Sequence, residues 1–215
     1  DWAYDYDCDS LAEKIRYFCR AYRAEAQRWR DSGRPKSTAD FVDRSIKWTT
    51  ELEAHMRRGT ELSFDVRRIV RSLYRPYVER LTYFAPVITH RPYQKFSLFP
   101  TEDARNIGYS FSVGRRSQFG VIALDRLPSL DMFIPSAGQV VCMWRYDENG
   151  KRQDNVTDWA LDQFKKHYQP GRAKQTRPVT KESIFHYVFG VLHDPVYREK
   201  YALNLKREFP RIPFY

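Results

Sequence analysis

The stretch Ile107–Leu127 reads IGYSFSVGRRSQFGVIALDRL. Between Tyr109 and Val113 large apolar side chains alternate with serines, and this period of two is typical of a β-strand. A second apolar run follows at Phe119–Leu124, after a polar Gly-Arg-Arg-Ser-Gln break. We therefore expect a β-hairpin at this point, in the middle of a β-rich region.

The turn of this expected hairpin carries four hydrogen-bonding side chains in succession. They are Arg115, Arg116, Ser117 and Gln118. Guanidinium groups bind guanine edges and phosphates in a bidentate manner, and hydroxyl and amide groups read base edges in the DNA major groove. Taken alone, a solvated turn is the simpler interpretation, because arginine and glutamine are ordinary surface residues. The choice between the two interpretations depends on the rest of the chain.

The charge balance favours a polyanionic partner. The 215 residues include 37 Lys and Arg against 27 Asp and Glu, a net charge of +10. The cations are distributed along the whole chain, so any basic patch must be made by folding. The 15 Tyr, 14 Phe and 5 Trp supply a packed core and also surfaces on which bases can stack.

The sequence carries no sign of secretion or of a membrane anchor. Cys8, Cys19 and Cys142 show neither metal-site spacing nor an even-numbered disulfide framework, which favours free thiols in a reducing compartment. There is no secretory signal and no apolar run long enough to cross a bilayer. We expect a cytoplasmic protein, and the start at Asp1 without a methionine suggests a fragment of a longer one.

The N-terminal third has the pattern of a mainly helical segment. Apolar residues recur at helical spacing after Ser10, which fits a capping box with Glu13, and Gly33 ends the run. A second helix is expected from Ile46 to Arg58 and a third from about Asp65 to Tyr74.

Both outer helices of this segment carry cations. The polar face of the first helix holds Lys14, Arg16, Arg20, Arg23, Arg28 and Arg30. A solvated face is the simpler interpretation of that row. The third expected helix carries Arg67, Arg68 and Arg71 next to the β-rich region, and these three are the preferred candidates for phosphate contacts.

From Arg75 onward, prolines separate short aromatic and β-branched runs, a pattern typical of compact β structure. The expected strands are Tyr77–Phe84, Phe96–Phe99, Met132–Ile134 and Gln139–Trp144, with a turn at Asp147–Gly150. One loop of this region places His90, Arg91, Tyr93 and Lys95 within six positions. Such a loop contacts nucleic acid through charge, hydrogen bonds and stacking together, or it is a rigid connection whose tyrosine packs inward.

The C-terminal part returns to helix. Thr157 with the following aspartate caps one helix, Thr180 opens another, and Asp194-Pro starts a third. His186 and His193 lie seven positions apart on one helical face. Since no further ligands are near in sequence, we expect two packing histidines rather than a metal site.

The motifs of common enzymes are missing. The sequence has no phosphate-binding Gly-x-x-x-x-Gly-Lys-Ser/Thr loop, no Gly-x-Gly-x-x-Gly, no His-Glu-x-x-His and no Gly-x-Ser-x-Gly. The Asn-Pro-Pro-Tyr type of motif used by amino-methylating DNA enzymes is also absent. No nucleophile, base and orienting residue can be named together, so the segment is not expected to be catalytic by itself.

Several blocks carry a resemblance to a known family. They are DWAYDYD, IKWTTELEAHMRRG, SLYRPYVERLTYF, NVTDWALDQF and, above all, KESIFHYVFGVLHDPVYREKYALNLKREFPRIPF. Together they resemble the C-terminal part of type ISP restriction-modification enzymes and related bacterial helicase–methyltransferase proteins. In that family one polypeptide joins a nuclease, an ATP-driven helicase-like motor, a coupler, an adenine-N6 methyltransferase and a target-recognition domain.

The resemblance implies that this chain is the target-recognition domain, with an α+β fold. Residues 1–75 would be a helical segment following the methyltransferase, 76–153 a mainly antiparallel β recognition region, and 154–215 a helical cap. The implied partners are double-stranded DNA and the upstream methyltransferase and motor domains of the same chain. S-adenosylmethionine, ATP and Mg²⁺ would bind to the parent protein, with no cofactor in this fragment.

The candidate DNA contacts are chosen by their chemistry, since the resemblance supplies no residue list. Base edges or adjacent phosphates are assigned to Arg115 and Arg116, and base edges to Ser117 and Gln118. The remaining candidates are the second loop (His90, Arg91, Tyr93, Lys95), the strand entry (Arg105, Asn106) and the phosphate set (Arg67, Arg68, Arg71).

Two alternatives stay open. The chain could be a docking module that attaches to the other domains of the same enzyme, with its net charge facing an acidic neighbour. It could also bind single-stranded DNA or RNA, using its tyrosines as stacking platforms. Steep salt dependence of duplex binding would favour the DNA interpretation.

Overall fold

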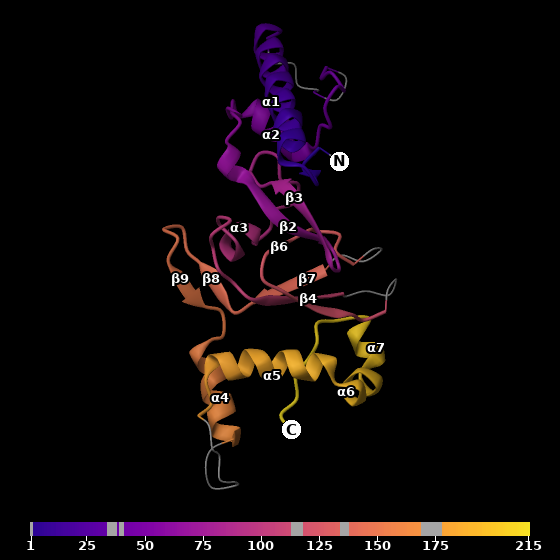
Figure 1. The fold of residues 1–215 in the computed structure, drawn as a ribbon, viewed down its shortest axis with the longest axis vertical. Helices are drawn as coiled ribbons and strands as arrows, with labels where there is room; N and C mark the ends of the chain where they lie inside the picture. Colours follow the sequence, from indigo (N-terminus) through magenta and orange to yellow (C-terminus); the bar gives the residue numbers. More distant parts are fainter. Residues whose placement is uncertain (1, 34–37, 39–40, 113–117, 134–137, 169–177) are drawn as a thin grey trace. The chain divides into compact units, whose positions relative to one another are not determined.

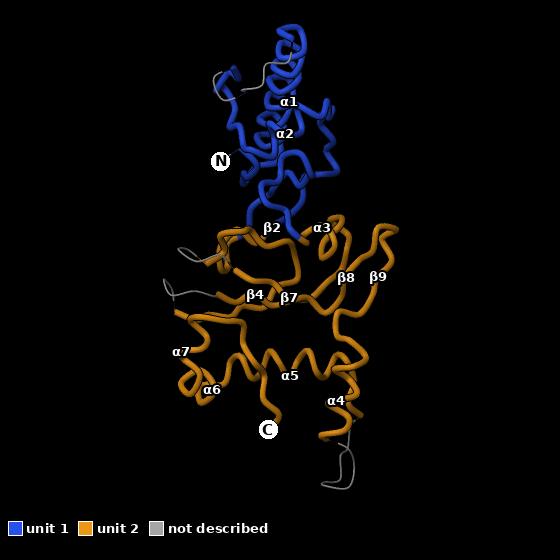
Figure 2. Tube along the Cα trace, turned by 180° about the vertical axis from the view of Figure 1, so that it is seen from behind, with its two compact units in different colours: residues 1–72, 79–93 blue, residues 73–78, 94–215 orange. Residues whose placement is uncertain are grey.

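The structure is a computed structural model that describes residues 2–33, 38, 41–112, 118–133, 138–168 and 178–215. The chain divides into two compact units (Figure 2), of which unit 1 contains residues 1–72 and 79–93 and unit 2 contains residues 73–78 and 94–215. The three-part division expected from the sequence differs from this one. The reason is that the β-rich middle and the C-terminal helices share one core.

The fold is of the α+β class, as expected (Figure 1). The first half holds β1 (Tyr4–Asp5), α1 (Cys8–Asp31), α2 (Thr50–Arg57), the 3-10 turn η1 (Val66–Arg68), β2 (Ile69–Arg75), β3 (Val78–Tyr83) and α3 (Lys95–Leu98). The second half holds β4 (Gly108–Ser112), β5 (Val121–Leu124), β6 (Leu127–Pro128), β7 (Gly138–Cys142), β8 (Trp144–Tyr146), β9 (Arg152–Asp154), α4 (Asp158–Tyr168), α5 (Lys181–His193), α6 (Pro195–Lys200) and α7 (Ala202–Leu205).

The long helix α1 provides the core of unit 1. The apolar positions predicted to share one face are all buried: Leu11, Ile15, Phe18, Cys19, Tyr22, Ala26 and Trp29. The predicted capping box at Ser10 is wrong, because the helix begins earlier. Asp7 is the N-cap, and its Oδ1 accepts a hydrogen bond from the Ser10 backbone N–H at 2.7 Å. An aspartate can cap because its carboxylate accepts from the unpaired N–H groups of the first turn.

The second helix is shorter than predicted, and it ends where predicted. α2 begins at Thr50, capped by the Thr49 hydroxyl, rather than at Ile46. Leu52 and Met56 point into the core of unit 1 as expected. The helix ends before Gly59, whose φ of +74° is a conformation that glycine adopts without steric cost.

The helix predicted from Asp65 to Tyr74 is wrong, because this segment forms η1 and then strand β2. Val66 is 57% exposed, so the apolar residues at helical spacing do not form one buried face. β-branched Ile69 and Val70 suit a strand, and pairing with β3 and β6 in a four-stranded sheet of order β1–β3–β2–β6 outweighs the helical pattern.

The predicted hairpin is present as β4 and β5, which pair antiparallel with Gly108 opposite Leu124 and Phe111 opposite Val121. β4 also pairs antiparallel with β7 on its other side, so it is the central strand of a three-stranded sheet. Every residue of β4 is buried, including Ser110 and Ser112. The serines therefore do not form a solvent-exposed face, because β4 is covered on both sides.

Gly108 permits the close pairing of β4 with β7. A Cβ atom at this position would lie 2.7 Å from Cys142 Sγ and 2.8 Å from the Val141 carbonyl oxygen. Cys142 is a free thiol, as are Cys8 and Cys19. Burial raises the pKa of Cys142 to about 12, so this thiol stays protonated at neutral pH.

Three other strand predictions need correction. At Met132–Ile134, neither Met132 nor Phe133 belongs to a strand, and Ile134 lies outside the described residues. Phe96–Phe99 was expected to be a strand, but Lys95–Leu98 forms the one-turn helix α3, in which the Phe99 N–H donates to the Lys95 carbonyl oxygen. The run Gln139–Trp144 is divided between β7 and β8. The turn at Asp147–Gly150 is confirmed, and it joins β8 to β9.

The C-terminal helices complete the core of unit 2. Phe185 and Phe189 of α5 lie 5.1 Å and 5.8 Å from the Tyr109 ring of β4, and α5 runs along the β4–β7 sheet (Figure 1). The predicted caps are confirmed at Thr157, Thr180 and Asp194. None of the helices in the described ranges is long and apolar enough to span a membrane.

Candidate nucleic-acid interface

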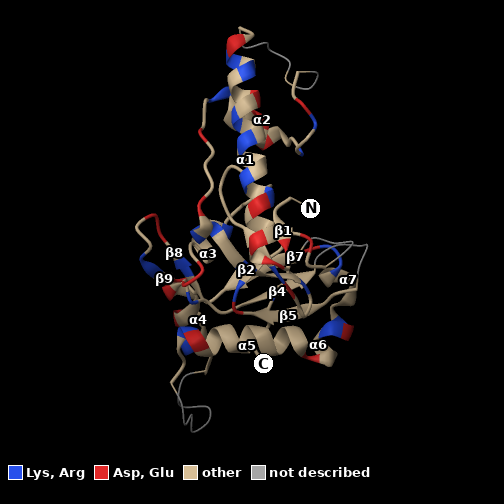
Figure 3. Ribbon diagram, turned by 45° about the horizontal axis from the view of Figure 1, so that its top comes forward, with Lys and Arg blue, Asp and Glu red and all other residues tan. Residues whose placement is uncertain are grey.

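Some cations of unit 1, namely Lys14, Arg28, Arg57 and Arg67, are paired with acidic residues inside the unit. Both blue and red residues occur along α1 (Figure 3). Lys14 Nζ lies 2.7 Å from Asp5, and Arg57 lies 3.1 Å from Glu53. The abundance of arginine and lysine in this part of the sequence therefore overstates the positive charge available to a partner.

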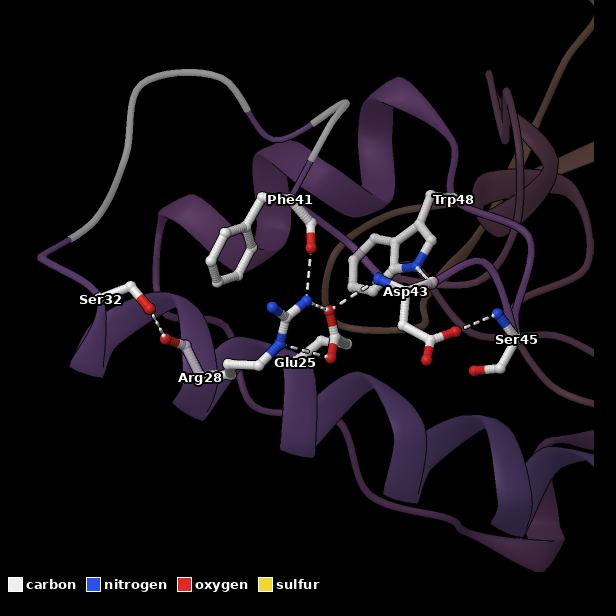
Figure 4. Close-up of polar contacts among 7 residues, drawn as sticks. All are labelled: Glu25, Arg28, Ser32, Phe41, Asp43, Ser45 and Trp48. Carbon is white, nitrogen blue, oxygen red and sulfur yellow. Dashed lines mark hydrogen bonds and ion pairs between the residues drawn. The ribbon is translucent and has the colours of Figure 1, made fainter.

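The clearest example is the cluster around Glu25 (Figure 4). The Glu25 carboxylate accepts from the Arg28 guanidinium at 3.0 and 2.6 Å and from the Asp43 backbone N–H at 2.8 Å. Arg28 also donates to the Phe41 carbonyl oxygen, and its guanidinium carbon lies 4.0 Å from the Phe41 ring centre. These bonds, those from Arg28 first, hold the pKa of Glu25 below its usual value. Arg28 thus connects α1 to the following loop.

The hairpin turn that the sequence singled out is only partly described. Arg115, Arg116 and Ser117 lie outside the described residues, so their role as base contacts stays a prediction. Gln118 is exposed, and its carbonyl oxygen accepts from the Ser112 hydroxyl at 2.9 Å. The buried end of β4 therefore holds the backbone of Gln118, while its amide side chain faces solvent.

Three of the four candidates of the second loop are exposed, namely His90, Arg91 and Tyr93. Arg91 and Tyr93 have φ values of +47° and +45°, and Tyr93 is 71% exposed. Left-handed backbone is unfavourable for side chains of this size, and such strain is often found at functional positions. His90 instead lies 3.0 Å from the Glu51 carboxylate. Arg91 and Tyr93 are thus the better candidates of this loop, because the His90 ring already has the Glu51 carboxylate as a partner.

Lys95 belongs to unit 2 and is partly buried at the start of α3. Burial lowers its pKa to about 8, and the nearby Asp131 carboxylate acts in the opposite direction. At neutral pH the amine is still mostly protonated. Its partial burial makes it a weaker candidate for a phosphate contact than an exposed lysine.

The three phosphate candidates lie on η1 and β2 and not on a helix. The Arg67 guanidinium makes two bonds to the Asp65 carboxylate, at 3.0 and 2.9 Å. The Arg67 bonds hold the pKa of Asp65 below its ordinary value. Arg68 and Arg71 are exposed. Among these three, Arg68 and Arg71 have the more available guanidinium groups.

At the strand entry, the two candidates differ in accessibility. Arg105 is exposed, whereas Asn106 is only 3% exposed. The Asn106 amide donates to the Leu98 and Trp144 carbonyl oxygens, both at 2.9 Å, and accepts from the Trp144 N–H at 3.2 Å. Because these bonds occupy the amide within the fold, we assign Asn106 a structural role and remove it from the candidate contacts.

The sequence interpretation missed Tyr77, at the turn between β2 and β3. Its side chain is 90% exposed, and its φ is +63°. A large exposed aromatic residue at a strained turn position is a plausible contact for a partner. The Arg-Pro-Tyr tripeptide could have indicated it, because proline before a residue at positive φ is typical of a tight turn.

The two C-terminal histidines show no metal-site geometry. His193 Nδ1 lies 2.9 Å from the Phe189 carbonyl oxygen, and both His186 and His193 are exposed. Within the described residues, no group of three or more His, Cys, Asp or Glu side chains could hold a metal ion.

Comparison with known proteins identifies the family. The family model of the type ISP C-terminal specificity domain matches residues 1–215. No curated protein matches the chain. In a cryo-EM structure of a DrdV–DNA complex, the DrdV chain is 38% identical, with a TM-score of 0.82 over 100% of this chain and 20% of that one.

Two further solved structures share the fold. One is a nuclease-deletion mutant of the type ISP restriction-modification enzyme LlaGI with a DNA substrate mimic, at 22% identity and a TM-score of 0.78 over 99% of this chain and 19% of that one. The other is the ATP-dependent type ISP restriction-modification enzyme LlaBIII bound to DNA, at 20% identity and a TM-score of 0.76. The match covers 99% of this chain and 13% of the LlaBIII chain. This chain thus spans a fifth or less of each of the three relatives. It belongs to the family of type ISP C-terminal specificity domains.

Proposed function

We propose that this chain recognises a specific double-stranded DNA sequence on behalf of a type ISP restriction-modification enzyme. The observation that carries the proposal is its similarity over its full length to part of DrdV, at 38% identity, in a structure solved as a DNA complex. The specificity-domain family supports the same function. The net charge of +10 suits a duplex partner.

In this proposal the chain chooses the sequence, and other parts of the parent polypeptide perform the chemistry. Recognition directs adenine-N6 methylation, for which the target base must be turned out of the helix into the methyltransferase. Recognition also directs ATP-dependent restriction by the motor and nuclease. S-adenosylmethionine, ATP and Mg²⁺ bind to those other parts, and the upstream domains are partners of this chain.

In this proposal, different exposed residues contact the phosphates, stack on bases and read base edges. Arg68, Arg71, Arg91 and Arg105 present guanidinium groups that suit phosphates. The exposed Tyr93 ring offers a surface for stacking. The turn that ends at Gln118 supplies the predicted base contacts.

The test is selection of bound DNA from a pool of random duplexes, at low and near-physiological salt, followed by sequencing. We expect one short asymmetric motif to be enriched, with affinity that falls steeply as salt rises, since binding releases counterions from phosphates. Enrichment of no motif at either salt concentration would overturn the proposal. Competition with single-stranded DNA of the enriched sequence separates duplex recognition from single-strand binding.

A second candidate function is docking onto the rest of the parent enzyme. The exposed Tyr77 favours it, since aromatic residues at such positions often anchor protein interfaces. A docking module would bind the upstream domains with little salt dependence and would select no DNA motif. Replacing Tyr77 would then weaken that association and leave duplex binding unchanged.

A further inference from the structure

The β8–β9 hairpin is a two-stranded sheet with polar side chains on an open face. Arg145 lies directly opposite Gln153 in the antiparallel register, so both side chains point to the same side of the ribbon. Both residues are exposed. Figure 1 shows the hairpin projecting from the rest of unit 2, with the turn at its far end.

The base of the hairpin is firmly attached, although isolated two-stranded sheets are marginally stable. The buried Asn106 amide holds both backbone groups of Trp144. The Tyr146 hydroxyl donates to the Arg105 carbonyl oxygen at 2.7 Å. On the face opposite Arg145, the Arg152 guanidinium lies 4.3 Å from the Trp144 ring centre. The hairpin is therefore preorganised, which reduces the entropy lost on binding.

The Arg145 and Gln153 side chains retain donor and acceptor groups that can bind a partner. Within the described part of the chain, the Arg145 guanidinium has no hydrogen-bond or ion-pair partner. Gln153 Nε2 donates to Asp147 Oδ2 at 3.2 Å. A carboxylate accepts only, so this bond fixes the orientation of the amide. One N–H and the Oε1 oxygen of Gln153 remain free, and they are the donor and acceptor that a bidentate contact requires.

The charge of the hairpin favours contact with bases over contact with phosphates. Residues 144–154 contain three cations, Arg145, Lys151 and Arg152, and three acids, Asp147, Glu148 and Asp154. An element that grips phosphates carries excess positive charge, and this hairpin carries none. The major groove admits a two-stranded β-ribbon, and there arginine pairs with guanine O6 and N7 while glutamine pairs with adenine N6 and N7.

We propose that the β8–β9 hairpin enters the major groove of the target duplex, where Arg145 reads a guanine and Gln153 reads an adenine in neighbouring base pairs. This inference rests on the proposed function, because it assigns base contacts within that DNA recognition. It adds to the hairpin turn around Arg115 a second element that discriminates sequence.

The experiment repeats the selection from random duplexes with the full 215-residue chain and four variants. Arg145→Ala is expected to lose the preference at one guanine, by about 5- to 150-fold in affinity ratio, and Gln153→Ala to relax a neighbouring position. Arg145→Lys keeps the charge and loses the bidentate geometry, so it too should lose the guanine preference. Lys151→Ala is the matched control, an exposed cation of the same hairpin that should leave the motif unchanged.

The outcomes separate this inference from the proposed function. If the wild-type chain selects no motif, the proposed function fails first. If the wild-type chain selects a motif and Arg145→Ala selects the same one with equal preference, the hairpin is not a reading element, although target recognition stands. If Arg145→Ala weakens all sequences alike while Arg145→Lys binds normally, Arg145 contacts phosphate, which also overturns the assignment. Unchanged circular dichroism and thermal midpoints verify that each variant is folded.

Discussion

Both compact units contain internal ion pairs, yet Arg28 of unit 1 and Arg145 of unit 2 show two different uses of an arginine side chain. In unit 1, arginines of α1 and α2 pair with carboxylates of the same unit, as the Glu25–Arg28 cluster shows (Figure 4). In unit 2, the core forms around the fully buried β4, and the β8–β9 hairpin leaves Arg145 without an internal partner. The difference teaches that the number of cations does not locate an interface. The cations available to a partner are those whose N–H groups form no hydrogen bonds or ion pairs within the fold.

The largest expected effect tests the dependence of unit 2 on β4. Phe111 is 2% exposed and packs against Phe119 and Phe209. Phe111→Ala is expected to reduce the free energy of unfolding by about 3–5 kcal/mol, because it removes buried area and leaves a cavity. Urea denaturation measures the change, with Arg145→Ala as the surface control. A loss below about 1 kcal/mol would show that β4 is not the centre of this core.

The second prediction concerns Lys95, the partly buried lysine at the start of α3 in unit 2. Burial lowers the pKa of Lys95 from 10.5 to about 8, so the folded state binds this proton less tightly than the unfolded state. The charged amine therefore destabilises the fold at pH 7, and this penalty fades as the pH rises from about 8 to about 10.5. Lys95→Met is expected to raise the free energy of unfolding at pH 7 by up to about 3 kcal/mol.

Urea denaturation at pH 7 and pH 10 tests this prediction. The difference between variant and wild type should shrink at the higher pH. A variant less stable than wild type at pH 7 would contradict it. A uniform loss of DNA affinity in Lys95→Met would in turn restore Lys95 as a phosphate contact.

The third prediction tests the structural use of charge in unit 1. Glu25→Gln weakens the bonds to Arg28 and to the Asp43 N–H, and it is expected to cost about 1–3 kcal/mol at pH 7. Arg28, above all, lowers the pKa of Glu25 in the folded state. The contribution is therefore complete above the unfolded pKa of about 4.5 and is lost as the pH falls through the lower folded value.

Thermal unfolding from pH 7 down to pH 3 would follow the loss of this contribution. The exposed Glu13 of the same helix provides the control, as Glu13→Gln. DNA affinity should not change in Glu25→Gln. A large change in DNA affinity of Glu25→Gln, with unchanged stability, would contradict the structural role of the Glu25–Arg28 pair.

The smallest expected effect concerns Tyr77. Tyr77→Asn is expected to stabilise the chain by about 0.5–1 kcal/mol, because asparagine tolerates the left-handed conformation better than tyrosine does. A thermal melt with Tyr77→Phe as the control measures this effect. Equal or lower stability of the asparagine variant would mean that contacts of the aromatic ring offset the strain.

The sequence predicted features whose causes are local. The buried face of α1, the caps at Thr180 and Asp194 and the turn at Asp147–Gly150 all depend on residues within a few positions of one another. The pairing of β4 with β5 was also predictable, because a short break separates two apolar runs.

The sequence interpretation failed where a distant partner decides the outcome. Residues 69–75 fit a helical pattern, yet β3 and β6 make them a strand. Asn106 was a candidate DNA contact, but its amide is occupied by two hydrogen bonds with the backbone of Trp144, 38 positions away. Arg145 and Gln153 drew no attention in the sequence, because only strand pairing brings them face to face.

The sequence by itself determined the α+β class, the family resemblance and the starts of the C-terminal helices at Thr157, Thr180 and Asp194, since each depends on local patterns. Only the tertiary structure decided which polar side chains are available to a partner. Availability depends on burial and on hydrogen bonds made across the fold, and neither can be read from the order of residues along the chain.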